Sequence, residues 1–403
     1  MSTTSQPTPS SHGPSPQPWW AIAGTGAAVI AICYGFARYA YGLFVPEFAA
    51  AFDLAASGIG MLGGISTLGY TAGLFAAPLL ANRSSRAATI TAGASASLGL
   101  LTIGLAPVLP VFAAGLFLAG TSAGLVSPAV AQLVTDTVAS RIRPRAQTWA
   151  NIGTSFGLAA SAFTPLLNFG WRVTWVGFGV VAGLVTLAAV MLLPRTRGAT
   201  VRNSGAQGSR FRRPGLVVLL AHSLLLGLTS VPYWNFSIQR LQDLGADGAV
   251  AAWFWLCIGA AGLLGGLTGS LSGRFGLTRV NVAVWTLWAV ALGVMALPEP
   301  SLIALFVSAG LFGAAFMALT GVCILWAARL YPKETVRGVT LSFFFLGIGQ
   351  TLGSPLAGAV ADGAGLGAAF AGAAVLSLLV WLQLFPSLRA PEDGYPHQSR
   401  SPS

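Results

Sequence analysis

The sequence predicts an all-α membrane protein with twelve transmembrane helices in two pseudo-symmetric six-helix bundles. Three observations lead to this prediction. First, 55% of the 403 residues are hydrophobic and only 8% are charged, whereas about 25% are charged in an ordinary soluble domain. Second, the chain divides into twelve apolar runs, each long enough to cross a bilayer. Third, the two halves of the chain share a weak internal repeat.

The twelve spans follow from the thickness of a membrane, because a hydrocarbon core about 30 Å thick needs about 20 apolar helical residues. Division of the chain at its polar breaks gives spans at 19–45, 57–81, 87–106, 110–137, 146–168, 171–193, 214–239, 248–272, 280–298, 301–329, 337–361 and 364–386. The third and fourth spans are separated only by Ala106-Pro-Val-Leu-Pro110, which is a turn because of its two prolines.

Polar segments flank and separate the two halves. Residues 1–18 and 387–403 are rich in Ser, Pro and Gln, and we expect them to be disordered cytoplasmic tails. Residues 194–213 form the longest internal polar segment, which we interpret as a cytoplasmic linker. The N-terminal bundle would then occupy 19–193 and the C-terminal bundle 214–386.

The orientation follows from the positions of Arg and Lys, because cytoplasmic loops retain positive charge. If alternate loops lie on the same side, 18 of the 21 basic residues share one side. Arg172 and Arg240 fall on the other side and Arg38 lies within a span. This asymmetry predicts a multi-pass protein of the plasma (inner) membrane with both termini in the cytoplasm.

Composition and motifs argue against several other classes of protein. The net charge of +11 is spread in short clusters between apolar runs, a pattern of membrane topology rather than of nucleic-acid binding. The one lysine, Lys333, does not sit in a Gly-Lys-Ser/Thr phosphate loop, and two of the three histidines lie in the tails. We therefore expect that the protein is not an enzyme and that it binds neither a cofactor nor a metal ion. The expected partners are the lipid bilayer and a small-molecule solute, and we expect a monomer.

The internal repeat consists of three matches in the same order at nearly one offset. The segment Pro78–Arg86 after the second span aligns with Gly269–Gly276 after the eighth, 191 residues later. Arg145-Ala146 aligns with Arg337-Gly338 at an offset of 192 residues, and Gly153 and Gly157 align with Gly349 and Gly353 at 196. Each match is weak alone, but together they indicate two related halves.

With these motifs the sequence resembles the major facilitator superfamily, whose loop between helices 2 and 3 carries G-x-L-a-D-R-x-G-R. In the first copy the matching residues are Leu80, Arg83 and Arg86, and in the second they are Gly269, Leu271, Arg274 and Gly276. Pro78, Asn82 and Ser85 replace the Gly, Asp and Gly of the pattern. The resemblance covers about residues 19–386.

The resemblance implies alternating access by rocking of two bundles, with the loop arginines acting in the switch between states. Arg83, Arg86 and Arg274 are therefore the candidate gating residues. Because the usual aspartate of the loop is missing, Asp136 near the inner end of the fourth span is a further gating candidate, as an alternative partner for Arg83 or Arg86.

Arg38 is the main candidate for binding a solute, because an ionisable residue inside a bilayer is costly. Helical spacings of four and three place Tyr34, Arg38 and Tyr41 on one helix face. A guanidinium beside two phenols suits a carboxylate or another anion. The alternative is a structural role, in which Arg38 snorkels to the membrane surface or pairs with Glu47.

The seventh span offers a second group of candidates, since Ser230-Val-Pro-Tyr-Trp-Asn-Phe-Ser237 combines a helix-breaking proline with aromatic and amide side chains. We favour Tyr233 or Trp234 as a cavity residue, against a plain role in the aromatic belt of the membrane. Weaker candidates for the substrate site are Asn151 and Gln350. His222 could take part in proton coupling, although hydrogen bonding inside the protein explains it more simply.

The function predicted from these features is secondary active or facilitative transport of a small solute by alternating access. The deep arginine favours an organic anion. Two alternatives stay open: an exporter of hydrophobic drugs or toxic metabolites, and a membrane receptor or scaffold that transports nothing.

Overall fold

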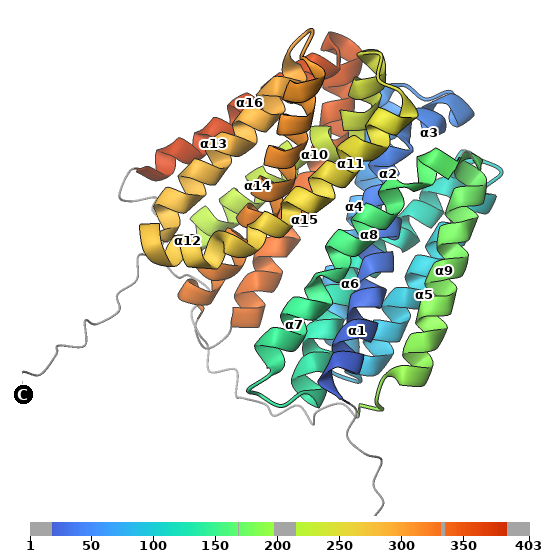
Figure 1. Ribbon diagram of the computed structural model, residues 1–403, viewed down its shortest axis with the longest axis vertical. Coiled ribbons are helices and arrows are strands. Elements are labelled where there is room, and N and C mark those ends of the chain that lie inside the picture. The colour runs from blue at the N-terminus through green and yellow to red at the C-terminus, as the bar shows by residue number, and fades with distance from the viewer. Residues whose placement is uncertain (1–17, 168, 197–214, 332–334, 385–403) are drawn as a thin grey trace, which may run out of the picture.

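The computed structural model describes residues 18–167, 169–196, 215–331 and 335–384, and within these ranges the elements are all helical. The chain forms two groups of helices that stand side by side, one from each half of the sequence (Figure 1). The two predicted tails, and nearly all of the predicted linker at 194–213, lie outside the described residues.

The first group consists of the elements from α1 to α9. Their bounds are α1 Trp19–Ile30, the π-helix η1 Ala31–Tyr39, α2 Ala40–Leu43, α3 Val45–Phe52, α4 Ala56–Ala81, α5 Ser85–Leu105, α6 Leu109–Thr137, α7 Arg143–Asn151, α8 Gly153–Ala162, the 3₁₀-helix η2 Thr164–Leu167 and α9 Gly170–Leu192.

The second group consists of the elements from α10 to η4. Their bounds are α10 Leu216–Asp243, α11 Gly248–Gly262, the 3₁₀-helix η3 Leu263–Leu267, α12 Thr268–Phe275, α13 Leu277–Ala296, α14 Leu302–Leu330, α15 Thr335–Ala364, α16 Leu366–Ser377 and the 3₁₀-helix η4 Leu378–Leu384.

Each of the twelve predicted spans corresponds to one of these helices or to a run of consecutive ones. Within the described ranges, ten helical segments are long and apolar enough to cross a membrane by length and composition. The other two spans are the fifth, which is interrupted at Ile152 between α7 and α8, and the twelfth, whose apolar helix Leu366–Leu382 is shorter. The predicted turn between the third and fourth spans is confirmed, since α5 ends at Leu105 and α6 begins at Leu109.

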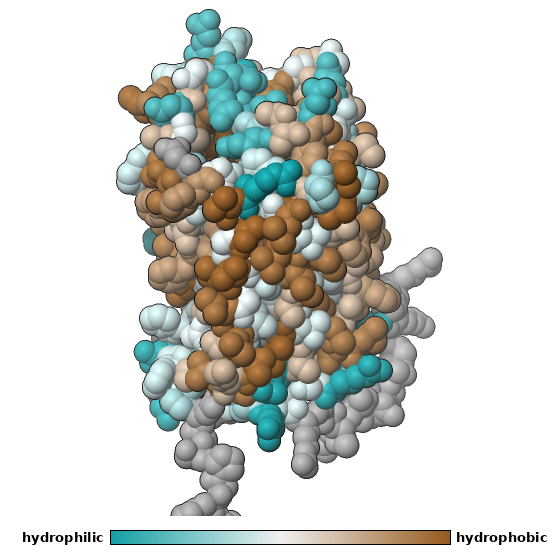
Figure 2. All heavy atoms as spheres, turned by 90° about the vertical axis from the view of Figure 1, so that its right-hand side faces the viewer, coloured by the Kyte–Doolittle hydropathy of each residue, from teal (hydrophilic) through white to brown (hydrophobic). Residues whose placement is uncertain are grey.

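The surface has the distribution of polarity that a membrane requires. On the face shown in Figure 2, apolar side chains cover most of the middle, and polar side chains gather toward the two ends. On α9, for example, Leu184 and Met191 are 62% and 72% exposed. Apolar surface of this extent is unfavourable in water but favourable against lipid chains.

The structure explains the glycine repeat that the sequence shows. A methyl group at Gly153 or Gly157 of α8 would overlap the backbone carbonyl oxygens of Ala27 and Ala31, respectively. In the second half, a methyl group at Gly349 would overlap the carbonyl oxygen of Leu224. Glycines therefore let the fifth and eleventh spans approach the first and seventh at equivalent places, as small residues do in membrane helix pairs.

The two bundles meet mainly toward one end of the molecule, which we call the closed end and define by Ala56 of α4 and Asp362 of α15. Here α4 packs along α15, α8 packs on α11, and α2 and α3 pack on α10. A methyl group at Gly60 would overlap the carbonyl oxygen of Ser354, and one at Gly358 would overlap that of Ala56. At the opposite end, α1 and α7 pack within the first bundle, whereas α12 packs within the second.

Candidate functional site

A small cavity of about 30 Å³ lies where the bundles meet. Its lining comes from both halves of the chain: Arg38, Tyr39, Tyr41, Gly42, Gly63, Ser66, Thr67, Val231, Trp234, Asn235, Gln350 and Ser354. A cavity of this volume holds about one or two water molecules. In this conformation it is therefore too small for an organic solute, and the bundles must separate around it before one can enter.

Arg38 is the charged residue of this cavity and is only 8% exposed. Its guanidinium carbon lies 3.5 Å from the ring centroid of Tyr70, and Tyr39 and Tyr34 are at 5.7 Å and 5.9 Å. Its Nη2 donates a hydrogen bond to Oε1 of Gln350, whereas Nη1 is buried and makes no hydrogen bond. The charge is thus stabilised by aromatic faces and a neutral amide.

The structure does not support a pairing of Arg38 with Glu47. In the described part of the chain, no ion pair involving Arg38 is found, and its hydrogen-bond partner is an amide. Glu47 lies in α3, where its Oε2 is buried without a hydrogen-bond partner, and burial raises the pKa of its carboxyl group above the usual range. The guanidinium therefore has capacity for a further acceptor.

The π-helical turn changes which tyrosines lie next to Arg38. The expected face of Tyr34, Arg38 and Tyr41 assumed α-helical spacing, but Arg38 lies in the π-helix η1, whose hydrogen bonds join residues five apart. Tyr39 therefore lies near Tyr34, at 6.0 Å between ring centroids. Tyr41 lines the cavity, but its hydroxyl donates a hydrogen bond to the carbonyl oxygen of Ile59 at 2.7 Å.

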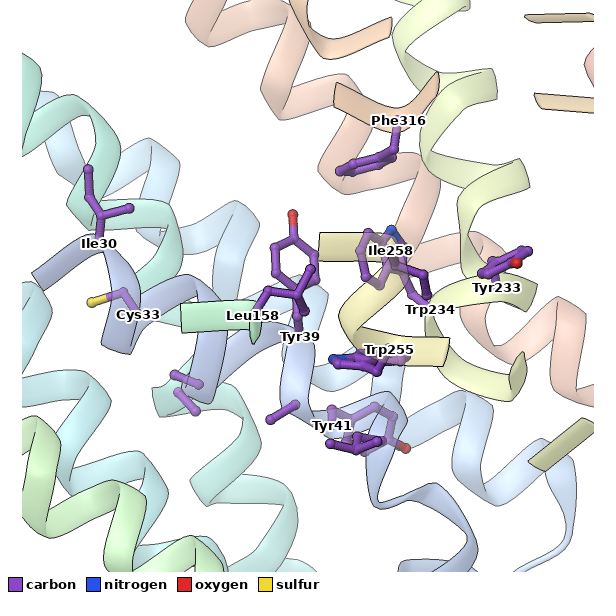
Figure 3. Close-up of a cluster of buried hydrophobic side chains, with 14 of the residues drawn as sticks. Ile30, Cys33, Tyr39, Tyr41, Leu158, Tyr233, Trp234, Trp255, Ile258 and Phe316 are labelled. Atoms are coloured by element: carbon purple, nitrogen blue, oxygen red, sulfur yellow. The ribbon is translucent and has the colours of Figure 1, made fainter. Parts of the chain in front are cut away.

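The candidates of the seventh span separate in the structure. Trp234 lines the cavity and stacks on Tyr39 of the other bundle at 4.3 Å between centroids (Figure 3). Tyr233 is fully buried inside the second bundle, where its hydroxyl lies 2.8 Å from that of Ser308 and its ring stacks on Phe312 at 3.7 Å. Asn235, which we did not favour, lines the cavity with Trp234.

Asn151 and His222 lie outside this cavity. Asn151 is exposed at the end of α7, where its side chain accepts a hydrogen bond from Gln147. His222 is buried in the second bundle, and Trp285 donates its indole N–H to the His222 Nε2 at 2.9 Å. The same Nε2 lies 2.9 Å from Oδ1 of Asn281, so the polar contacts of His222 are made inside the second bundle.

In this conformation Asp136 is hydrogen-bonded to neighbours other than the loop arginines. Asp136 instead accepts hydrogen bonds from Ser85 at 2.6 Å and from Gln132 at 2.7 Å. Arg86 donates to the carbonyl oxygens of Val190 and Leu193 at the end of α9, where a helix carries partial negative charge. The other two gating candidates, Arg83 and Arg274, are exposed.

A contact between the bundles that the sequence did not reveal lies at the closed end. Both carboxylate oxygens of Asp362 on α15 accept hydrogen bonds from the first backbone amides of α4, those of Ala56 at 2.8 Å and Ser57 at 2.9 Å. A negative charge at a helix N-terminus is favourable, because the first N–H groups lack partners within the helix. Asp362 therefore holds one bundle to the other.

We expect Asp362→Ala to make the closed end open more readily, since it removes the acceptor for two amides of the other bundle. Double electron–electron resonance between spin labels at Ala51→Cys and Ala249→Cys would measure this change as a shift toward longer distances. Asp247→Ala is the matched control, because Asp247 accepts the amide of Val250 in its own bundle at 2.8 Å. Equal distance distributions in the two variants would contradict the role of Asp362.

A family model and curated proteins match this chain. Residues 30–384 match the model of a family described as uncharacterised MFS-type transporter YbfB. The chain is also 30% identical over 172 residues to the chloramphenicol efflux pump Rv0191 of Mycobacterium tuberculosis strain H37Rv, a match that covers 41% of each protein. The chain thus spans about two fifths of the length of the curated relatives it matches.

Solved structures match over nearly the whole chain. The inward-open xylose transporter XylE from E. coli has a TM-score of 0.75 at 14% identity and covers 94% of this chain and 98% of its own. The nucleoside transporter NupG has a TM-score of 0.72 at 11% identity, with coverages of 93% and 99%. An inward-facing bacterial homologue of the human lysosomal transporter Spinster has a TM-score of 0.72 at 17% identity, with coverages of 93% and 98%. At these identities the likeness concerns the fold.

Proposed function

This chain belongs to the MFS-type transporter family, and from that premise we propose that its solute is a small organic anion bound at Arg38. The family and the fold make it a membrane transporter that works by alternating access between two bundles. We further propose that it acts as a monomer, catalyses no chemical reaction and is divided into the bundles 19–193 and 214–386.

The observation that carries the proposal is that the guanidinium of Arg38 is buried and has an unused hydrogen-bond donor. Its Nη1 is buried and without a hydrogen-bond partner, Arg38 lines the cavity, and none of the other lining residues carries a carboxylate. A buried charge is costly unless it is paired. A carboxylate that enters between the bundles would supply the missing acceptor, and hydrogen bonds between charged groups are the stronger ones.

The direction in which the cavity would open also belongs to this proposal. We place the end opposite the closed end, which carries the loop arginines, in the cytoplasm, because basic residues concentrate there. The closed end would then face outward, and the cytoplasmic side would have to open further around Arg38 before a solute could enter. The membrane would be the plasma (inner) membrane, with both termini inside.

The topology gives a direct prediction. Single cysteines introduced at Ser204 in the linker and at Ala246 between α10 and α11 should react differently with a membrane-impermeant maleimide added to intact cells, because only Ala246 lies outside. We expect labelling at Ala246 and none at Ser204 until the cells are opened. Labelling of Ser204 in intact cells would reverse the orientation.

Export of a hydrophobic drug is the second candidate function. The specific observation in its favour is the 30% identity to a chloramphenicol efflux pump, over 41% of the chain. The aromatic pair Tyr39 and Trp234 in the cavity lining could contact an uncharged aromatic solute as well as an anion. The two functions differ in whether the negative charge of the solute is required.

A thermal shift experiment with matched pairs separates the two functions. The purified protein would be heated with benzoate and benzamide, with phenylacetate and phenylacetamide, and with chloramphenicol. The anion proposal predicts stabilisation by a carboxylate and little by its amide. Equal shifts within each pair, or a shift with chloramphenicol alone, would favour export of neutral drugs. Flux of the stabilising compound in liposomes would exclude a receptor that transports nothing.

A further inference from the structure

The acceptor bound to Arg38 comes from the other bundle. Arg38 lies in η1 of the first bundle, whereas Gln350 lies in α15 of the second and is 3% exposed. A guanidinium has only donors, so the Gln350 amide must present its oxygen to Arg38. Its nitrogen donates to the hydroxyl of Ser230 at 3.1 Å, which fixes the amide in this orientation.

Few hydrogen-bond acceptors can reach the guanidinium of Arg38 in this conformation. Tyr70 covers one face at 3.5 Å, and Nη2 is occupied by Gln350. The cavity that Arg38 lines has a volume of about 30 Å³, which admits water but not an organic acid. The bundles thus close around Arg38 with a protein oxygen at Nη2, where the second oxygen of a carboxylate bound to both Nη1 and Nη2 would lie.

We propose that Gln350 is an internal substitute for the carboxylate of the solute. This inference rests on the proposed function at Arg38. When the bundles close without a solute, the Gln350 oxygen solvates the guanidinium and so lowers the cost of burying its charge. When an anion binds, its carboxylate displaces the amide and takes over the same role.

The reason for such a device lies in the transport cycle. A carrier that releases its solute on one side must close again without it before it can bind the next solute on the first side. Closing around an unpaired guanidinium would be unfavourable, because a buried charge without a partner carries a large desolvation cost. Gln350 is neutral, so its bond to Arg38 is weaker than an ion pair and a carboxylate can compete with it.

The test measures the closed end in protein without solute, by double electron–electron resonance between labels at Ala51→Cys and Ala249→Cys. Both positions are exposed, one in each bundle, and the three native cysteines would be replaced. Gln350→Ala should lower the ratio of closed to open molecules by at least about tenfold, since it removes a hydrogen bond to a charged group. Gln350→Glu should do the opposite, because its carboxylate pairs permanently with Arg38.

A double variant and a chemical rescue separate this role from a general loss of packing. In the Arg38→Ala background, Gln350→Ala should have little further effect, because there is no charge left to solvate. Sodium acetate should restore the closed population of Gln350→Ala, where the shortened side chain leaves room for it, and should not change the double variant. Gln350→Leu should open the closed end as Gln350→Ala does, without rescue by acetate.

Three results would overturn the inference: an unchanged distribution in Gln350→Ala, an equal effect of that substitution with and without Arg38, or no rescue by acetate. These outcomes are distinct from a failure of the proposed function. That failure would appear in the wild-type protein, as carboxylates that neither stabilise it nor cross the membrane through it.

Discussion

Replacement of Arg38 by Ala is expected to abolish most transport of an anionic solute. The substitution removes the one cation of the cavity lining, with its free Nη1. Hydrogen bonds to charged groups are worth about 1.5 to 3 kcal/mol, so the affinity should fall by roughly tenfold to over a hundredfold. Uptake of the stabilising carboxylate into proteoliposomes, measured over a range of concentrations, would report the loss.

Conservative variants make this result specific. Arg38→Lys keeps the charge but loses the planar fork, so it should retain part of the transport. Tyr34→Phe should cause a smaller loss, because the hydroxyl of Tyr34 accepts a hydrogen bond from Ser127 at 3.1 Å. Tyr41→Phe should also cause a smaller loss, since its hydroxyl is bound to a backbone carbonyl. Normal transport by an Arg38→Ala protein that is correctly inserted would contradict an anion site at Arg38.

Gly60→Ala is expected to have the second-largest effect, a shift toward the open state, because Gly60 lies at the contact between the bundles. The new methyl group would overlap the backbone carbonyl of Ser354 and lie 3.2 Å from Cα of Pro355. Overpacking of this kind costs about 1 to 3 kcal/mol, and the strain is relieved when α4 and α15 separate. The closed end should therefore open, and the ratio of closed to open molecules should fall about five- to 150-fold.

The control for Gly60 is Gly177→Ala in α9, where a methyl group would have no neighbour within 4 Å. Both substitutions replace a helical glycine by the best helix former, so a general effect on helix stability would appear in both. Spin-label distances across the closed end should change only for Gly60→Ala. If the distances change in neither variant, the contact between α4 and α15 does not determine how far the closed end closes.

The fold was predictable from the sequence to an unusual degree because the membrane imposes simple rules. A backbone inside a bilayer must satisfy its own hydrogen bonds, so each apolar run of sufficient length becomes a helix. The breaks at proline, glycine and arginine clusters then separate the helices. The interruption at Ile152 was not predicted, because it lies within an apolar run beside the close approach of Gly153 to Ala27.

The site was predictable only in part, because it is assembled across long separations in sequence. Arg38 stood out as a charge within an apolar run, and Gln350 as a weak candidate. Tyr70 gave no signal, since a tyrosine in an apolar helix has no pattern that points to an arginine 32 residues earlier. Asp362 also gave no signal in the sequence, because only the packing of α15 on α4 places it at a helix N-terminus.

The π-helix illustrates the same limit in local structure. Helical periodicity of 3.6 residues placed Tyr41 with Arg38, whereas the wider turn of η1 brings Tyr39 to it instead. The choice between α and π hydrogen bonding depends on packing against neighbouring helices, such as the contact of Gly35 with Gly157. The periodicity of a single segment therefore cannot predict whether its hydrogen bonds are of the α or the π type.

The most direct test of the anion site is an experimental structure of the protein with the carboxylate that stabilises it best. We predict a carboxylate oxygen within hydrogen-bond distance of Nη1 of Arg38, with the Gln350 amide displaced from the guanidinium. A ligand bound among the aromatic side chains instead, with the Arg38–Gln350 hydrogen bond intact and no contact to Nη1, would contradict the account.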